Sequence, residues 1–204
     1  MSGPGNGHDP VQPLSFAFSA ENLEKAKATI GKYPAGRQKS AVLPLLDLAQ
    51  RQEGWVTRAA MDSIAELLDM APILVYEVAT FYSMFNLKPV GRHHVQVCTN
   101  VPCQLRGADQ VLAACKAELG IGLGETTADG QFSLAEVECL AACVNAPVIW
   151  LADDYYEDLD AESTKKLLQA LKRGESPKPG SQSGRLNSAP AGGPITLTTS
   201  PVKS

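Results

Sequence analysis

The chain has 204 residues, 44% of them hydrophobic, which suffices for one domain with an extension or for two small ones. Its formal net charge of −4 argues against a nucleic-acid-binding protein, which needs a basic face. No apolar run approaches the roughly 20 residues that cross a bilayer, and the first residues lack the basic and apolar regions of a secretory signal. Five cysteines in such a chain indicate metal ligation or burial in a reducing cytoplasm rather than disulfides.

The N-terminal part of the chain predicts helices. Residues 1–14 are rich in Gly and Pro and predict a disordered lead-in. Apolar side chains at helical spacing then predict a helical unit over residues 15–90, with Ser19 and Thr57 as caps of the first and third helices. The helices are expected at residues 20–32, 38–53, 58–70 and 73–82. Four aromatic side chains are interpreted as core rather than as a cofactor site: Trp55, Phe81, Tyr82 and Phe85.

The pattern changes at Gly91. Residues 93–98, 132–139 and 147–152 predict strands, with a short further strand at 155–159, and residues 104–119 and 162–172 predict helices. This order over residues 91–173 indicates a compact α/β layer of thioredoxin-like type, so the whole chain is expected to be an α+β protein. In the remainder, residues 174–204, 19 of 31 residues are Gly, Pro, Ser or Thr, which predicts a disordered tail or an arm laid on a partner.

Two groups of polar side chains are interpreted as neither catalytic nor metal-binding. His93 and His94 are adjacent in a strand and face opposite sides of it, so they cannot act as a pair. An acidic run lacks the spacing of a calcium loop and is interpreted as a solvated edge or a partner-facing patch. Its members are Asp153, Asp154, Glu157, Asp158, Asp160 and Glu162.

Four cysteines form the most informative pattern. Cys98 and Cys103 are separated by four residues, Cys139 and Cys143 by three, and 35 residues lie between the two pairs. If the strands that precede the pairs are neighbours, the four sulfurs meet at one end of the sheet. The helix expected to begin near Gln104 would then point its positive dipole end at them. Four-cysteine sites hold zinc or an iron–sulfur cluster.

The spacing favours a binuclear iron–sulfur cluster over its competitors. Zinc sites usually have two-residue spacers in at least one pair, and no C-x-x-C is present for a dithiol oxidoreductase. Cubane clusters favour a tighter series of ligands. Zinc and unmetallated thiols nevertheless stay open at this point. The fifth cysteine, Cys115, falls on the apolar stripe of a predicted helix and is interpreted as a buried core thiol rather than a ligand.

Several segments of the chain carry a family resemblance. The strings YPAGRQKSAVLPLLDLAQRQEGWV, VYEVATFYSMF, CTNVPCQLRGA, ECLAACVNAPV and YYEDLD resemble the E-type subunit of NADH–quinone oxidoreductase, respiratory complex I, a thioredoxin-like [2Fe–2S] ferredoxin. The resemblance covers about residues 15–175 and continues into GRLNSAPAGGPITL. It implies a helical N-terminal bundle, a thioredoxin-like ferredoxin domain and an extended C-terminal arm. It also implies one [2Fe–2S] cluster on Cys98, Cys103, Cys139 and Cys143.

The same resemblance implies the partners and the location. A tightly bound subunit of complex I would hold FMN and NADH, exchange single electrons with this cluster, and join it to the rest of the peripheral arm. The chain would have no complete active site of its own, no nucleic acid and no direct membrane insertion. It would lie at the cytoplasmic face of a bacterial inner membrane. Related modules occur in NAD-linked hydrogenases and formate dehydrogenases, and a zinc-stabilised interaction module is the more remote alternative.

Two positions near the second cysteine pair lead to specific expectations. Pro147 occupies the place of the thioredoxin-fold proline before a strand, which predicts a cis bond between Ala146 and Pro147. The family commonly has Gly where this chain has Ala141. If that position needs a positive φ, Ala costs about 1 kcal/mol there.

Overall fold

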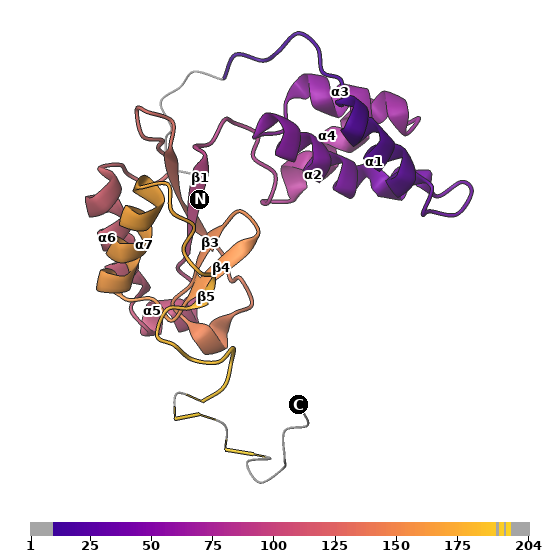
Figure 1. Ribbon diagram of the computed structural model, residues 1–204. Helices are drawn as coiled ribbons and strands as arrows, with labels where there is room; N and C mark the ends of the chain where they lie inside the picture. Colours follow the sequence, from indigo (N-terminus) through magenta and orange to yellow (C-terminus); the bar gives the residue numbers. More distant parts are fainter. Residues whose placement is uncertain (1–9, 191, 194, 197–204) are drawn as a thin grey trace. The chain divides into compact units, whose positions relative to one another are not determined.

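The structure, a computed structural model, describes residues 10–190, 192–193 and 195–196 (Figure 1). The chain divides into two compact units, one ending at Val90 and the other beginning at Gly91. Most of the predicted lead-in, residues 1–9, lies outside the described residues, as do residues 191, 194 and 197–204 of the predicted arm. In the part of the chain that is described, no helix has the length and apolarity to cross a membrane.

The first unit contains four α-helices and one 3-10 helix. They are α1 (Ala20–Ile30), η1 (Gln38–Ala41), α2 (Val42–Glu53), α3 (Arg58–Leu67) and α4 (Pro72–Phe81). Both predicted caps are confirmed: Ser19 Oγ accepts from the Asn22 N–H at 3.2 Å, and Thr57 Oγ1 accepts from the Ala60 N–H at 3.0 Å. These side chains satisfy amide groups that the first helical turn leaves without partners.

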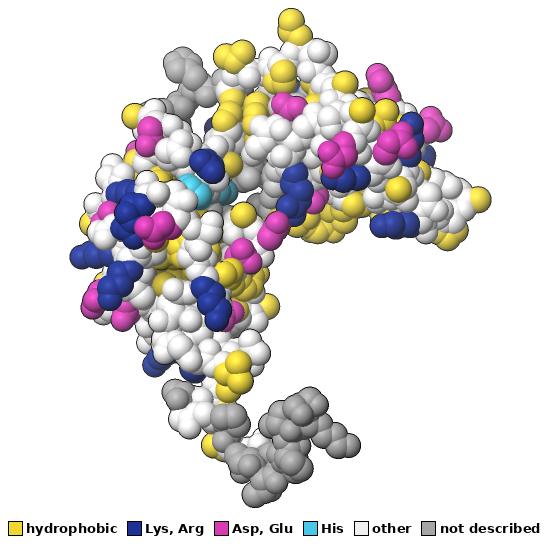
Figure 2. Space-filling model, viewed as in Figure 1, with side chains coloured by type: hydrophobic (Ala, Val, Ile, Leu, Met, Phe, Trp, Pro, Cys, Tyr) yellow, Lys and Arg dark blue, Asp and Glu magenta, His cyan; other side chains and the backbone are white. Residues whose placement is uncertain are grey.

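The apolar side chains of this unit divide between a core and an exposed face. Fully buried residues include Leu45, Leu46 and Ile64, and Phe85 and Trp55 are buried as predicted. The prediction that Phe81 and Tyr82 belong to the core is wrong, because they are 78% and 41% exposed at the end of α4. Further exposed apolar side chains on α4 and just after it are Ile73, Leu74 and Met84. Figure 2 shows hydrophobic side chains reaching the surface of the molecule.

The second unit is built on a mixed five-stranded sheet of order β2-β1-β3-β4-β5. The strands are β1 (His93–Cys98), β2 (Phe132–Val137), β3 (Ile149–Leu151), β4 (Asp154–Glu157) and β5 (Gly180–Ser181). The helices are α5 (Val101–Leu105), α6 (Ala108–Leu119) and α7 (Ala161–Lys172), with a 3-10 turn η2 (Cys143–Asn145). The chain is therefore α+β, as predicted.

One core holds this unit together. Helices α6 and α7 lie side by side on the same face of the sheet (Figure 1). Val111 of α6 and Leu168 of α7 are fully buried in one cluster with Val95 and Val97 of β1. Burying side chains of this size stabilises the folded state by about 1.5–3 kcal/mol each. The strand that leads to the first cysteine pair is thus fixed by the core.

Sheet register brings the two cysteine segments together. Strands β1 and β2 are parallel neighbours, with Cys98 opposite Val137, so both chain segments leave the sheet at the same end. On the other side β1 pairs antiparallel with β3, and Val97 lies opposite Ile149. The expectation that the strands preceding the two pairs are neighbours is confirmed.

Two predicted boundaries near the cysteines are wrong. The single helix expected over residues 104–119 is split into α5 and α6, because Gly107 has φ +101° and interrupts the helix. Asn100 caps α5 one turn earlier than expected, so Cys103 lies inside that helix and does not precede it. Strand β2 ends at Val137, and Cys139 belongs to the following loop.

The segment after α7 also differs from the prediction. Part of the predicted disordered or partner-bound arm packs on the chain's own sheet, since Gly180 and Ser181 pair with β4. Arg185 then forms an ion pair with Asp158 in which both side chains are at most 15% exposed. Asp158 and Glu157, interpreted from the sequence as solvated, make internal contacts here.

Gly91 provides a test of the packing at the start of the second unit. A Cβ added there would lie 2.6 Å from the Phe132 carbonyl carbon, too close for any real contact. We expect Gly91→Ala to lower the free energy of unfolding by about 1–3 kcal/mol, measured by urea denaturation. Gly122→Ala is the matched control, because its added Cβ would meet only the flexible Glu125 carboxylate. Equal stability of the two variants would contradict this packing.

Candidate metal centre

The four cysteines of the motif occupy one end of the second unit's sheet. Cys98 is the last residue of β1, and Cys103 lies in α5 five residues later. Cys139 lies in the loop after β2, and Cys143 is the first residue of η2. The parallel β1–β2 pairing is what delivers these segments to the same edge.

The thiols come in two pairs of different exposure. Cys98 and Cys103 are each 2% exposed, and the Cys98 thiol contributes to the raised pKa of Cys103. Cys139 and Cys143 are exposed, with their Sγ atoms 3.4 Å apart. Electrostatic interaction of Cys143 with both Cys98 and Cys103 connects one pair to the other. One pair is therefore set into the domain, and the other faces outward.

Burial and neighbouring thiols make Cys103 and Cys143 hard to ionise. Burial raises the pKa of Cys103 to about 12, and the neighbouring Cys98 thiol adds to that effect. A hydrogen bond with Cys139 raises the pKa of Cys143. Like charges held close together disfavour one another, so several thiolates at this place need positive charge among them. A bound metal supplies such charge and deprotonates the thiols that it binds.

The loop around the second pair has the predicted special backbone. Ala141 has φ +59°, and its N–H donates to Cys139 Sγ at 3.4 Å. The bond between Ala146 and Pro147 is cis, which confirms the prediction. On the first pair, a backbone hydrogen bond at Val148 favours the thiolate of Cys103. Backbone N–H groups near sulfur offset the negative charge of thiolates.

The arrangement of donors fits a binuclear cluster. In the described parts of the chain, no three His, Cys, Asp or Glu side chains gather around one point that could hold a metal ion. The thiols are placed as two pairs, the buried Cys98 and Cys103 and the exposed Cys139 and Cys143, whose Sγ atoms are 3.4 Å apart. A structural zinc ion takes four ligands around one point, whereas each iron of a [2Fe–2S] cluster takes two protein ligands.

The other candidates from the sequence have structural roles. Cys115 is fully buried in the core between α6 and the sheet, as predicted, and burial raises its pKa to about 12. The His93 ring lies against Phe132, with the centroids 5.0 Å apart. Burial lowers the pKa of both His93 and His94, which keeps them neutral.

Sequence reasoning missed three residues that contact the loop of Cys143. Asn145, Asp158 and Arg185 join that loop to the segment after α7 by hydrogen bonds. The signal available for them was weak, because an arginine in a Gly- and Ser-rich tail is usually solvated.

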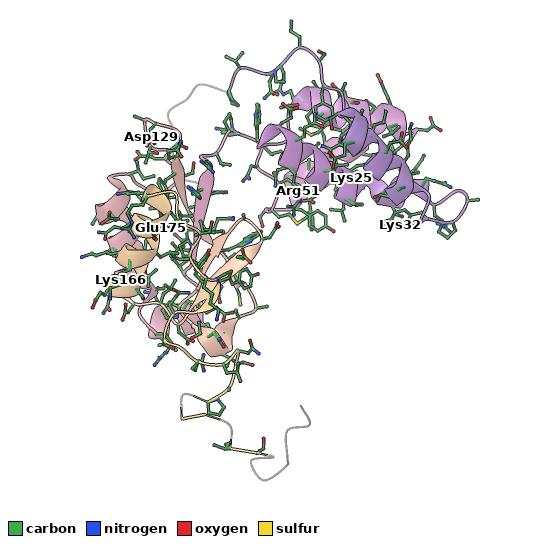
Figure 3. All side chains as sticks on the ribbon, viewed as in Figure 1. Lys25, Lys32, Arg51, Asp129, Lys166 and Glu175 are labelled. Atoms are coloured by element: carbon green, nitrogen blue, oxygen red, sulfur yellow. The ribbon has the colours of Figure 1, made fainter. Side chains whose placement is uncertain are left out.

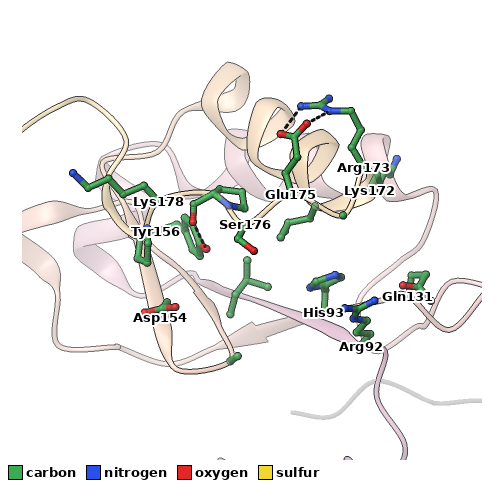
Figure 4. A pocket seen from close by; sticks show the side chains of 16 residues that line it. Arg92, His93, Gln131, Asp154, Tyr156, Lys172, Arg173, Glu175, Ser176 and Lys178 are labelled. Carbon is green, nitrogen blue, oxygen red and sulfur yellow. Dashed lines mark hydrogen bonds and ion pairs between the residues drawn. The ribbon is translucent and has the colours of Figure 1, made fainter.

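One cavity lies away from the cysteines. It has a volume of about 720 Å³ and lies between the end of α7, the segment that follows it, and the start of β1 (Figure 4). Arg92, His93 and Lys178 line it, and Arg173 pairs with Glu175 at its rim. None of the four motif cysteines borders this cavity.

The left-handed conformation of Ala141 yields a prediction. A Cβ is disfavoured at φ +59°, so Ala141→Gly should raise the free energy of unfolding by about 1 kcal/mol, measured by urea denaturation. Ala142→Gly is the control, because φ there is −107° and glycine gains nothing sterically. An Ala141→Gly variant no more stable than Ala142→Gly would contradict the strain.

Comparison with known proteins gives the family. The family described as thioredoxin-like [2Fe-2S] ferredoxin matches residues 26–172. NADH dehydrogenase [ubiquinone] flavoprotein 2, mitochondrial, of Dictyostelium discoideum is 48% identical over 97% of this chain and 78% of its own length. An E-type subunit of NADH-quinone oxidoreductase from Rhizobium meliloti (strain 1021) is 50% identical over 93% of this chain and 70% of its own. The E-type subunit of Rickettsia typhi (strain ATCC VR-144 / Wilmington) is 53% identical over 76% of this chain and 92% of its own length.

A solved structure shares the fold at lower identity. An NAD+-reducing [NiFe]-hydrogenase in the H2-reduced state matches 65% of this chain and 22% of its own, with a TM-score of 0.57 and 19% identity. That likeness concerns the fold alone, whereas the relatives near 50% identity extend over most of the chain. The chain belongs to the thioredoxin-like [2Fe-2S] ferredoxin family, in the group that contains the E-type subunits of NADH-quinone oxidoreductase.

Proposed function

We propose that this chain is the electron-transfer subunit of an NADH:quinone oxidoreductase, with a [2Fe–2S] cluster held by Cys98, Cys103, Cys139 and Cys143. The observation that carries the proposal is the convergence of two thiol pairs at one sheet end, in a chain half identical to E-type subunits of that enzyme. The hydrogenase likeness is limited to the fold, so it gives no further weight to the alternative of a hydrogenase or formate dehydrogenase subunit.

The two pairs have different tasks in this proposal. Cys98 and Cys103, buried at the end of β1 and in α5, would fix one iron to the core of the domain. Cys139 and Cys143 would hold the other iron at the surface. A bound [2Fe–2S] cluster supplies one-electron chemistry, accepting or giving a single electron at a time. The exposed pair therefore marks the side through which electrons enter and leave.

Backbone groups of this chain would tune the site. The Ala141 N–H donates to Cys139 Sγ, and the backbone at Val148 forms a hydrogen bond with Cys103. Hydrogen bonds to the sulfurs stabilise the more negative, reduced state and so raise the reduction potential. The left-handed Ala141 matters here, because its backbone conformation aims that N–H at the sulfur.

A partner subunit would supply FMN and NADH. Three apolar side chains next to the thiol segments are exposed: Val101 (67%), Leu105 (82%) and Val144 (66%). Apolar groups around a one-electron centre suit a protein interface, which excludes water from the path. The exposed face of α4 in the first unit offers a second contact to the peripheral arm. These features support a tight heterodimer with the flavin- and NADH-binding subunit.

In this proposal, the chain transfers electrons and other subunits carry out the reactions of NADH and quinone. The chain would act only within the larger enzyme, since hydride removal from NADH and quinone reduction take place elsewhere. The helical unit up to residue 90 and the ferredoxin unit from residue 91 would be separate domains. In a bacterial cell, attachment to the complex would place the chain at the cytoplasmic face of the inner membrane.

Substitution of single cysteines tests the ligand set. Each of Cys98→Ala, Cys103→Ala, Cys139→Ala and Cys143→Ala should reduce iron and acid-labile sulfide from about two of each per chain to near zero, because one iron loses a ligand and the two irons share the bridging sulfides. Cys115→Ala is the control and should keep both. Full iron content in any of the four variants, or zinc in the wild-type chain, would count against the proposed site.

An apolar-to-charged substitution tests the partner. Leu105→Asp should abolish copurification of this chain with the flavin- and NADH-binding subunit when the two are coexpressed, because a carboxylate cannot be buried there unpaired. Leu123→Asp is the matched control: Leu123 is 40% exposed and lies in the loop before β2, near the start of that strand. Retention of the partner by Leu105→Asp, at unchanged iron content, would contradict the docking surface and leave the cluster assignment intact.

A further inference from the structure

The segment after α7 returns to the cysteine end of the sheet. Strand β5 pairs in parallel with β4, so that Gly180 lies opposite Tyr156 and Ser181 opposite Glu157. The chain continues past Gly184, and residues 180–189, called here the C-terminal strap, run from the sheet edge to the loop that contains Cys143. The strap is thus attached to its own domain at both the sheet and the loop.

Arg185 is the centre of the contact between strap and loop. Its Nε and Nη2 donate to the two carboxylate oxygens of Asp158 at 3.0 and 2.7 Å. Nη2 also donates to the Val144 carbonyl at 2.8 Å, and Nη1 to the Ala189 carbonyl at 3.2 Å. The planar fork of arginine allows one side chain to hold a carboxylate and two carbonyls at once, which lysine cannot do.

This ion pair is more deeply buried than those on α1 and α7. The side chains of Arg185 and Asp158 are 15% and 12% exposed. By contrast, Lys25–Glu21 on α1 and Lys166–Glu162 on α7 are more than half exposed, and Figure 3 labels both lysines. Exposed pairs contribute little to stability, whereas breaking a shielded pair leaves a charge without its partner.

Asn145, the residue after Val144, makes a second contact between the loop and the strap. Asn145 is 4% exposed, and its Nδ2 donates to Glu157 Oε2 at 2.7 Å and to the Asn187 carbonyl of the strap at 2.9 Å. The Asn145 carbonyl accepts from the Asp158 N–H at 2.7 Å. Asp158 has φ +53°, a conformation that Asp tolerates better than most residues. The two residues directly after Cys143 are therefore held from outside the loop.

We propose that Arg185 is a positioning residue, which fixes the Cys143 loop through Val144 and Asp158 and so determines how firmly the exposed thiol pair holds its iron. Cys98 and Cys103 are held by β1, α5 and the core, but Cys139 and Cys143 are exposed and lie in a loop and a three-residue turn. The strap supplies the rigidity that this pair does not receive from a core. This inference rests on the proposed cluster.

The test compares two arginine-to-lysine variants of the full chain. Arg185→Lys keeps the charge near Asp158 but loses the fork that also reaches Val144. Arg173→Lys is the matched control, because Arg173 also grips a carboxylate, that of Glu175, but its ion pair is exposed and makes no contact with the Cys143 loop (Figure 4). Iron release to a chelator, the EPR spectrum of the dithionite-reduced chain, and amide hydrogen exchange of the metal-free chain are measured.

Arg185→Lys should release iron about 10-fold faster than the wild-type chain, as expected when a group that orients a metal ligand is lost. Its EPR g-values should shift, and amide exchange at residues 144–146 should accelerate in the metal-free chain. Arg173→Lys should match the wild type in all three measurements. Unchanged iron release and g-values in Arg185→Lys would overturn the inference while leaving the cluster in place.

Two further outcomes are distinguishable. A wild-type chain without a [2Fe–2S] signal would refute the proposed function, and faster exchange at residues 144–146 in Arg185→Lys alone would still establish the strap as the element that fixes the loop. If Arg185→Lys does not fold by circular dichroism, Asp158→Asn replaces it, since Asn also tolerates a positive φ. Loss of folding in both variants would assign the strap to general stability and overturn the positioning role.

Discussion

The parallel pairing of β1 with β2 is the constraint on which the rest of the molecule depends. It places Cys98 opposite Val137, so chain segments 35 residues apart leave the sheet at the same end. The core formed by α6, α7 and the sheet fixes that register, because a slip by one residue would turn the buried valines of β1 outward. Convergence of the thiols is therefore a consequence of packing that lies away from them.

The two cysteine pairs obtain their rigidity from different sources. The first pair is buried and inherits its position from β1 and α5. The second is exposed, and an exposed loop is not ordered by a core. A left-handed Ala141, the Asn145 contacts and the Arg185–Asp158 pair restrict this loop instead. In the proposed function, this arrangement would combine access for electrons with fixed positions of the thiols.

Much of this arrangement was predictable from sequence, because it depends on local rules. The caps Ser19 and Thr57, the strand ending at Cys98 and the buried Cys115 follow from residue type and spacing, whereas the cis bond before Pro147 was expected from the resemblance to the thioredoxin fold. Features set by tertiary contacts were not predictable. The exposure of Phe81 and the burial of Asp158 by Arg185 depend on segments distant in the chain, and acidic runs and Ser-rich tails usually face water. The break at Gly107 is local, but a glycine inside a helical pattern is often tolerated, so the pattern alone did not reveal it.

In the proposed function, the two thiol pairs would each bind one iron of a shared cluster. Mössbauer spectroscopy of the ⁵⁷Fe-loaded chain tests this most directly, because it reports the oxidation state and the magnetic coupling of every iron. We expect two high-spin ferric ions in sulfur coordination that couple to a diamagnetic oxidised state, and one ferric and one ferrous ion after reduction. A single magnetically isolated iron, or a chain that holds zinc and no iron, would contradict it.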